Sequence, residues 1–75
     1  MILKLKYFGS VAEALNKEAE ELDLDIVNVS ELIESFHSRL KDINFKVAVN
    51  HIVVDLNYQL NNNDEVALLP PFAGG

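Results

Sequence analysis

The residues with the clearest chemical meaning are the last six, Pro70 to Gly75, which read PPFAGG. Two of the chain's three glycines are Gly74 and Gly75. Glycine has no side chain, so such a tip can enter a narrow cleft and leave its carboxylate open to attack. Two successive prolines hold the preceding backbone extended, and six residues at ~3.3–3.6 Å each reach about 20 Å. The pattern predicts an arm, residues 70–75, whose reactive group is the Gly75 carboxylate.

The rest of the chain offers no comparable arrangement. There is no cysteine, which excludes disulfides, thiolate metal sites and a cysteine nucleophile. His37 and His51 have no second ligand at metal-binding spacing, which favours a surface role for both. Asp64 and Glu65 are adjacent near an expected strand, where neighbouring side chains point to opposite faces and do not converge. We therefore expect no metal, no cofactor bound by the chain itself and no enzyme activity of the chain on its own.

Size and charge narrow the class of protein further. Seventy-five residues form one small domain, and 49% of them are hydrophobic, enough for one core. The formal net charge of −6 argues against nucleic acid and against an anionic membrane surface as partners. It favours either a partner with a basic surface or plain solubility. With no long apolar run and no leader-like segment, a cytoplasmic protein without a membrane segment is expected.

The first half of the chain predicts a hairpin followed by a long helix. Residues 2–8 alternate as a strand with Leu3, Leu5 and Tyr7 on one face, and residues 11–16 predict a short helix. A second strand, containing Leu22, Leu24 and Ile26, is expected to pair with the first. Asn28 and Glu31 suit the N-cap and third position of the main helix. The apolar stripe of that helix is formed by Val29, Leu32, Ile33, Phe36 and Leu40.

The second half predicts three more strands, over residues 45–49, 52–55 and 66–70. Asn50 and His51 form the turn between the first two, and residues 56–64 form a polar loop in which Asn63 suits a positive φ. The order of elements indicates an α+β, ubiquitin-like β-grasp fold, a mixed sheet of about five strands packed on one main helix. The expected division is a β-grasp domain over residues 1–69 and a tail over 70–75.

Strand alternation also predicts a docking face. If the side of the sheet with Leu3, Leu5 and Tyr7 is the core, then Phe8, Ala48 and Leu69 point outward. Val53 joins them if its neighbours Ile52 and Val54 are in the core. Apolar side chains clustered on one outer face mark partner sites, so Phe8, Val53 and Leu69 are the candidate partner-binding residues.

A family resemblance appears at this point. The segment VAVNHIVVDLNYQLNNNDEVALLPPFAGG, with its D-E-V, Pro-Pro and Gly-Gly, resembles the C-terminal half of the small subunits of molybdopterin synthase, the MoaD family. The opening KYFGSVAEAL and the helix VSELIESF also stand where that family has its first strand, short helix and main helix. The resemblance covers essentially the whole chain.

The resemblance implies a sulfur carrier for molybdenum cofactor biosynthesis. An adenylyltransferase related to ubiquitin-activating enzymes would use ATP to adenylate Gly75, and a sulfur donor enzyme would convert it to a thiocarboxylate. The tail, Pro70, Pro71, Phe72, Ala73 and Gly74, would insert into the large synthase subunit, in a heterotetramer of two small and two large subunits. There the sulfur would pass to cyclic pyranopterin monophosphate to form the molybdopterin dithiolene.

Three other functions stay open on the sequence. A thiamine-pathway sulfur carrier would share the fold and the terminal Gly-Gly but not the Pro-Pro. A ubiquitin-like modifier would share the adenylation step and end up conjugated to protein lysines. A non-catalytic β-grasp binding module would use the tail for no chemistry.

Overall fold

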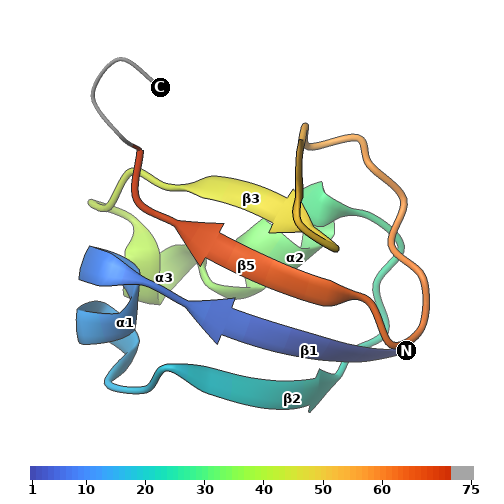
Figure 1. Ribbon diagram of the computed structural model, residues 1–75, viewed down its shortest axis with the longest axis horizontal. Helices are drawn as coiled ribbons and strands as arrows, with labels where there is room; N and C mark the ends of the chain where they lie inside the picture. The colour runs from blue at the N-terminus through green and yellow to red at the C-terminus, as the bar shows by residue number, and fades with distance from the viewer. Residues whose placement is uncertain (72–75) are drawn as a thin grey trace.

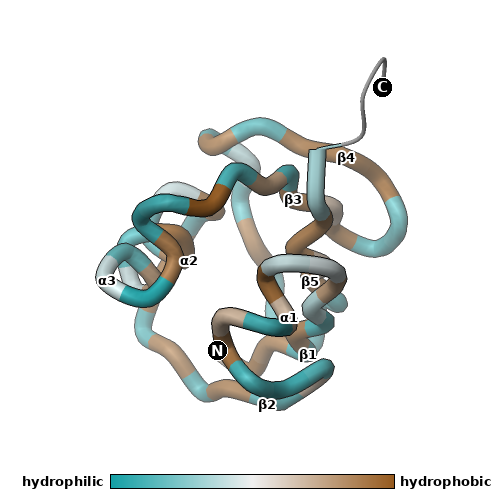
Figure 2. The backbone as a smooth tube through the Cα atoms, turned by 90° about the vertical axis from the view of Figure 1, so that its left-hand side faces the viewer, coloured by the Kyte–Doolittle hydropathy of each residue, from teal (hydrophilic) through white to brown (hydrophobic). Residues whose placement is uncertain are grey.

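The computed structural model describes residues 1–71 and shows one sheet covered on one side by helices (Figure 1). In the perpendicular view, the two helices between residues 29 and 40 lie together on one side of the sheet (Figure 2). The elements are β1 (Ile2–Tyr7), α1 (Gly9–Leu15), β2 (Ala19–Asp23), α2 (Val29–Ser35), α3 (His37–Leu40), β3 (Lys46–Val49), β4 (Ile52–Val54) and β5 (Glu65–Leu69). This is the predicted α+β, ubiquitin-like β-grasp fold.

The sheet is mixed, with strand order β2-β1-β5-β3-β4. β1 pairs antiparallel with β2 and parallel with β5, and β5 pairs antiparallel with β3. The last strand therefore has a partner on each side. Since the tail continues directly from β5, it leaves the domain from the central strand of the sheet.

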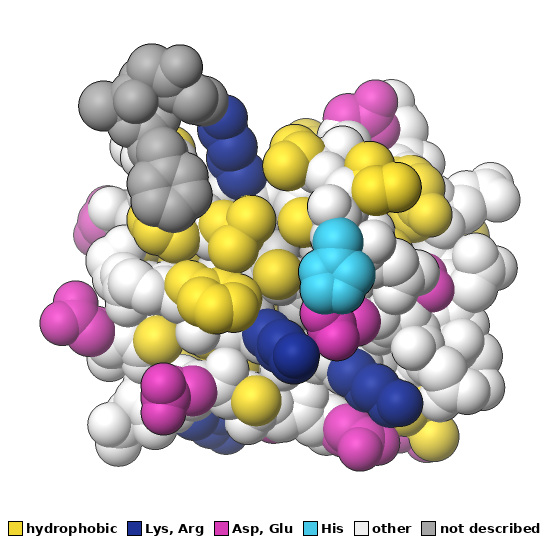
Figure 3. All heavy atoms as spheres, in the orientation of Figure 1, with side chains coloured by type: hydrophobic (Ala, Val, Ile, Leu, Met, Phe, Trp, Pro, Cys, Tyr) yellow, Lys and Arg dark blue, Asp and Glu magenta, His cyan; other side chains and the backbone are white. Residues whose placement is uncertain are grey.

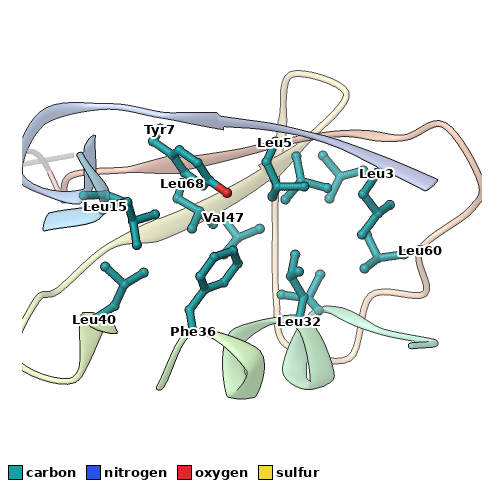
Figure 4. Close-up of a cluster of buried hydrophobic side chains, with 14 residues drawn as sticks. Leu3, Leu5, Tyr7, Leu15, Leu32, Phe36, Leu40, Val47, Leu60 and Leu68 are labelled. Atoms are coloured by element: carbon teal, nitrogen blue, oxygen red, sulfur yellow. The ribbon is translucent and has the colours of Figure 1, made fainter. Parts of the chain in front are cut away.

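Alternation along the strands separates a core face from an outer face. Leu3, Leu5 and Tyr7 are buried, whereas Lys4 and Lys6 between them are exposed. The core side chains of the sheet meet those of the helices, as the close-up shows for Leu5, Phe36 and Leu32 (Figure 4). The aromatic rings of Tyr7 and Phe36 pack edge to face, with centroids 6.0 Å apart.

The predicted hairpin is present, but its second strand begins earlier than expected. β2 starts at Ala19, and its residues pair with β1 from Lys6↔Ala19 to Ile2↔Asp23. Because β1 continues to Tyr7, whose amide donates to the carbonyl of Glu18 at 2.9 Å, the pairing reaches back into the segment that looked merely polar. Ile26, expected in the strand, lies in the connection to α2.

The main helix has the predicted N-cap but not the predicted length. Asn28 Oδ1 accepts from the Glu31 amide at 2.9 Å, and Glu31 Oε1 accepts from the Val27 amide at 2.6 Å. The helix then breaks at Phe36 (φ −101°, ψ 2°), which separates α2 from α3. At the break, the Ser35 hydroxyl donates to the Leu32 carbonyl at 2.6 Å. A serine hydroxyl that donates to a carbonyl of its own helix competes with the backbone amides for that carbonyl. The prediction of one uninterrupted helix was therefore wrong.

Two predicted turn conformations are confirmed. Asn50 and His51 both have positive φ (50° and 74°), which suits the two-residue turn between β3 and β4. Asn63 has φ 72°, and its amide donates to the Ile2 carbonyl at 2.6 Å. Asparagine tolerates this conformation better than other residues with a side chain.

Candidate functional site

The root of the tail is held by the end of β1. The Phe8 amide donates to the Leu68 carbonyl at 3.2 Å, which extends the β1–β5 pairing toward the tail. Gly9, at φ 56°, lies so close to Pro70 that a Cβ added there would be 3.1 Å from Pro70 Cγ. The Pro70 ring is therefore packed against the backbone of Gly9, and the direction of the chain at the root is set by this contact. Phe72, Ala73, Gly74 and the proposed reactive Gly75 lie outside the described residues.

Beside this root is an apolar area that we call the tail-side face. The cross-strand pairs Ala48↔Val53, Ala48↔Ala67 and Lys46↔Leu69 place their side chains on the outer side of the sheet. Figure 3 shows apolar side chains gathered on this side of the sheet. Its apolar members are Phe8, Ala48, Val53, Ala67 and Leu69.

The structure brings the three predicted partner-binding residues onto this one face. Phe8 is 45% exposed and Val53 61% exposed, while Leu69 is half-buried. Two supporting expectations need correction. Ala48 has the predicted orientation but is buried, because its small side chain lies between Val53 of β4 and Ala67 of β5. Ile52, expected in the core, is 67% exposed, because the three-residue edge strand β4 has only β3 as a neighbour in the sheet.

Charged side chains border the tail-side face. Lys6 Nζ lies 3.4 Å from Glu65 Oε1, and His51 Nε2 lies 3.7 Å from Glu65 Oε2. Lys46 stands at the start of β3, directly opposite Leu69. No pattern in the sequence indicated this grouping, since it depends on which strands become neighbours.

Asp64 is a second feature that sequence reasoning missed. It is 8% exposed, and its Oδ1 accepts from Asn50 Nδ2 at 3.0 Å while Oδ2 accepts from the Asn61 amide at 2.8 Å. Asn50 Oδ1 in turn accepts from the Glu65 amide at 3.1 Å. These bonds tie the β3–β4 turn to the start of β5, so they fix one end of the strand that carries the tail. As predicted, Asp64 and Glu65 do not form a converging pair.

A polar contact also joins the side chains of β1 and β2. The buried Tyr7 hydroxyl donates to Glu20 Oε2 at 2.5 Å, and Lys17 Nζ donates to Glu20 Oε1 at 3.0 Å. Burial raises the pKa of Tyr7 well above its usual value, and the bond to Glu20 raises it further. Burial alone would raise the pKa of Glu20, but the bonds from Tyr7 and Lys17 outweigh it and lower that pKa. Both side chains have structural partners, so this pair supports β1 and β2 rather than a reaction.

Within residues 1–71, no three or more His, Asp or Glu side chains are grouped as a metal site would require. His37 and His51 are both exposed, as predicted. In the same described part, every helix is too short to cross a bilayer. The features that the domain does assemble are a fixed tail root and an apolar face beside it.

Comparison with known proteins assigns the chain to a family. The model of the ThiS family matches residues 5–75. The molybdopterin synthase sulfur carrier subunit of Mycobacterium tuberculosis is 34% identical over 76 residues, covering 92% of each chain. The subunit of the same name from Escherichia coli is 30% identical over 81 residues, covering 99% of this chain and all of its own.

Solved structures show the same fold over nearly the whole chain. A putative molybdopterin converting factor subunit 1 from Pyrococcus furiosus has a TM-score of 0.86 and 26% identity, covering 96% of this chain and 99% of its own. A complex of subunits 1 and 2 of the molybdopterin-converting factor from Helicobacter pylori matches with a TM-score of 0.71 and 26% identity, over 100% of both chains. SAMP1 from Haloferax volcanii, at 21% identity, TM-score 0.81 and full coverage of both chains, shares the fold. The chain belongs to the ThiS family, in which its curated relatives are molybdopterin synthase sulfur carrier subunits.

Proposed function

We propose that this protein is the sulfur carrier subunit of a molybdopterin synthase and that sulfur is carried on the carboxyl group of Gly75. The observation that supports this most directly is the tail root held beside an exposed apolar face, in a chain whose curated relatives have that function. The absence of cysteine leaves the main-chain terminus as the natural place for an acyl-bound sulfur.

The proposed chemistry begins with adenylation. The Gly75 carboxylate attacks the α-phosphorus of ATP in an adenylyltransferase, and pyrophosphate leaves. Hydrosulfide supplied by a donor enzyme then attacks the acyl carbon, AMP leaves with the carboxyl oxygen, and the sulfur loses its proton. This two-step route replaces a poor leaving group, oxide, with a good one. The product is a thiocarboxylate at Gly75.

Sulfur transfer would take place in the large subunit. The thiocarboxylate sulfur bonds to a carbon of cyclic pyranopterin monophosphate and displaces an oxygen substituent of that carbon. Water then attacks the acyl carbon, the bond between acyl carbon and sulfur breaks, and the carboxylate is restored. Repetition at the neighbouring carbon gives the dithiolene. The Helicobacter pylori complex of subunits 1 and 2 supports a large-subunit partner. The chain itself supplies the carried group and the docking surface.

Intact-mass spectrometry tests the carrier function. After incubation with the cognate adenylyltransferase, ATP and a sulfur donor, we expect the mass of the protein to shift by the replacement of one oxygen with sulfur. An unchanged mass with demonstrably active enzymes would rule the carrier function out. Higher-mass isopeptide adducts on other proteins would instead identify a modifier, the function open to a chain that shares its fold with SAMP1.

A pair of variants on β4 tests the docking face. Val53→Glu should weaken binding of the large subunit by about 10-fold or more, because it places a charge within an apolar contact. Ile52→Glu should leave affinity unchanged. Ile52 is adjacent and as exposed, and the substitution changes the net charge equally, but its side chain points away from the tail-side face. Titration calorimetry measures both, and equal affinities for the two variants would refute this docking face.

A further inference from the structure

A pocket opens at the edge of the sheet, where β3 and β4 separate. The pairing of these strands ends at Val47↔Val54, and the chain after β4 turns away from β3. The pocket has a volume of about 400 Å³, and we call it the β4 pocket. The charged side chains in its lining belong to Lys46 and Asp55. Its apolar lining consists of Ile33, Phe45, Val47, Val53, Val54 and Leu56.

Hydrogen bonds of the segment after β4 fix one wall of the β4 pocket. Asp55 Oδ1 accepts from the Asn57 amide at 2.9 Å, an Asx-turn that bends the chain directly after the strand. The segment then passes the start of α2, where the Leu56 carbonyl accepts from the Ser30 amide at 3.0 Å (Figure 1). The wall that carries the Leu56 side chain is therefore held by main-chain bonds, and the pocket is a feature of the fold.

The β4 pocket adjoins the tail-side face. Val53 belongs to both, and Lys46 of the pocket lies directly opposite Leu69 on β5. Neighbouring strands are ~4.8 Å apart, so the pocket begins about one strand spacing from Leu69. The tail-side face extends from β1 to β4, over three such spacings or about 15 Å. A partner of standard size covers about 800 Å² of each protein, a patch about 30 Å across, and so reaches past this face.

The two margins of the sheet offer such a partner different surfaces. Toward β2, the outer side of the sheet carries charged side chains, since Lys4 pairs with Glu21 and Asp23 follows on the same strand. Toward β4, Val53 and Leu56 are 61% and 56% exposed and lead into the apolar pocket. Clustered apolar side chains mark partner contacts, whereas charged ones are costly to cover. The contact is therefore expected to extend across β4.

The lining of the β4 pocket suits an apolar side chain better than a polar small molecule. Small-molecule sites occupy ~300–1,000 Å³ and orient their ligands with several polar groups. The β4 pocket is near the lower end of that range. Its charged side chains are already engaged, Asp55 with the Asn57 amide and Lys46 in an interaction of its own. A large apolar side chain buried in such a pocket is a common source of affinity at an interface.

We propose that the large subunit receiving the tail inserts one large apolar side chain into the β4 pocket. This inference rests on the proposed function, because it concerns the partner of the same docking face. The inserted side chain is a second anchor, beyond the residues of the tail-side face. It contacts Leu56 at the rim of the pocket and Ile33 of α2 inside it.

The test is the affinity of the large subunit of the same organism for pocket variants, measured by titration calorimetry. Leu56→Asp should weaken binding by about 10-fold or more, because it places a charge at the apolar rim. Its control is Val27→Asp, which makes the same change of charge at a side chain that is 57% exposed and outside the pocket. Ile33→Phe should also weaken binding by about 10-fold, since the larger ring fills the pocket. Its control is Ile43→Phe, the same substitution at a half-buried isoleucine outside the pocket. Both controls should bind normally.

Sulfur loading measured by mass separates this inference from the proposed function. Equal affinities of the Leu56→Asp and Val27→Asp variants would overturn the inference, as would unchanged affinity of a folded Ile33→Phe variant. Slower loading with unchanged affinity for the large subunit would overturn it too, and would assign the pocket to the adenylyltransferase. Thermal unfolding shows whether each variant is folded, and the rim pair decides the question if Ile33→Phe is not. A protein that is loaded but fails the affinity test contradicts only the inference about the pocket.

Discussion

Deletion of Gly75 should reduce sulfur loading by about 100-fold or more without changing the stability of the domain. Each residue of extended chain contributes ~3.3–3.6 Å, so the shortened tail would present its carboxylate that far from the α-phosphorus of ATP. A misplacement of about 1 Å can already cost 10²-fold in a positioned reaction. The measurement is the initial rate of thiocarboxylate formation, followed by intact mass.

Two controls separate tail length from folding. The deletion lies beyond β5, the last strand, so the thermal unfolding midpoint should match that of the full chain. Gly74→Ala keeps the tail length and adds one methyl group, so its loading rate should lie between the other two. If the protein lacking Gly75 is loaded at the full rate, the position of the carboxylate does not control the reaction and the proposed chemistry is wrong.

Phe36→Ala should remove most of the stability of the domain. The Phe36 side chain is fully buried and packs edge to face on Tyr7. Truncation of a buried phenylalanine to alanine costs about 3–5 kcal/mol. A domain of this length has a total free energy of unfolding of only about 4–11 kcal/mol. Urea unfolding followed by circular dichroism should therefore show a variant that is largely unfolded or close to it.

Phe8→Ala is the matched control for that prediction. It removes the same atoms from a side chain that is 45% exposed on the outer face, so its stability loss should stay below about 1 kcal/mol. Similar losses for Phe36→Ala and Phe8→Ala would show that the helix break at Phe36 is not an anchor of the core.

Local rules predicted the parts of the fold that depend on local chemistry. The Asn28 cap, the Asn50–His51 turn and the positive φ of Asn63 each follow from the conformational preferences of asparagine. The early start of β2 does not, because it depends on how far β1 extends as its partner. The break after Ser35 depends on the hydrogen bond from the Ser35 hydroxyl to the Leu32 carbonyl. The spacing of apolar residues along the chain does not predict such a bond.

The candidate site was predictable in its members but not in its surroundings. Alternation placed Phe8 and Leu69 on the outer face. That rule needs only one residue of each strand to be assigned to the core, because neighbouring side chains point to opposite faces. The burial of Ala48 and the exposure of Ile52 depend on the neighbours that each strand acquires. The charged border has the same origin, since Lys6 and Lys46 meet one face only after β5 enters between β1 and β3.

The location of β5 also determines how the domain responds to mechanical force. In the proposed complex, withdrawal of the tail from the partner pulls along β5, at right angles to the hydrogen bonds that pair it with β3 and across the slanted bonds that pair it with β1. Force in that direction shears both ladders and is shared among their hydrogen bonds, so the bonds do not open one after another. An edge strand such as β4 would resist with a single ladder. A carrier with this topology can be pulled free by its tail while the sheet behind it stays intact.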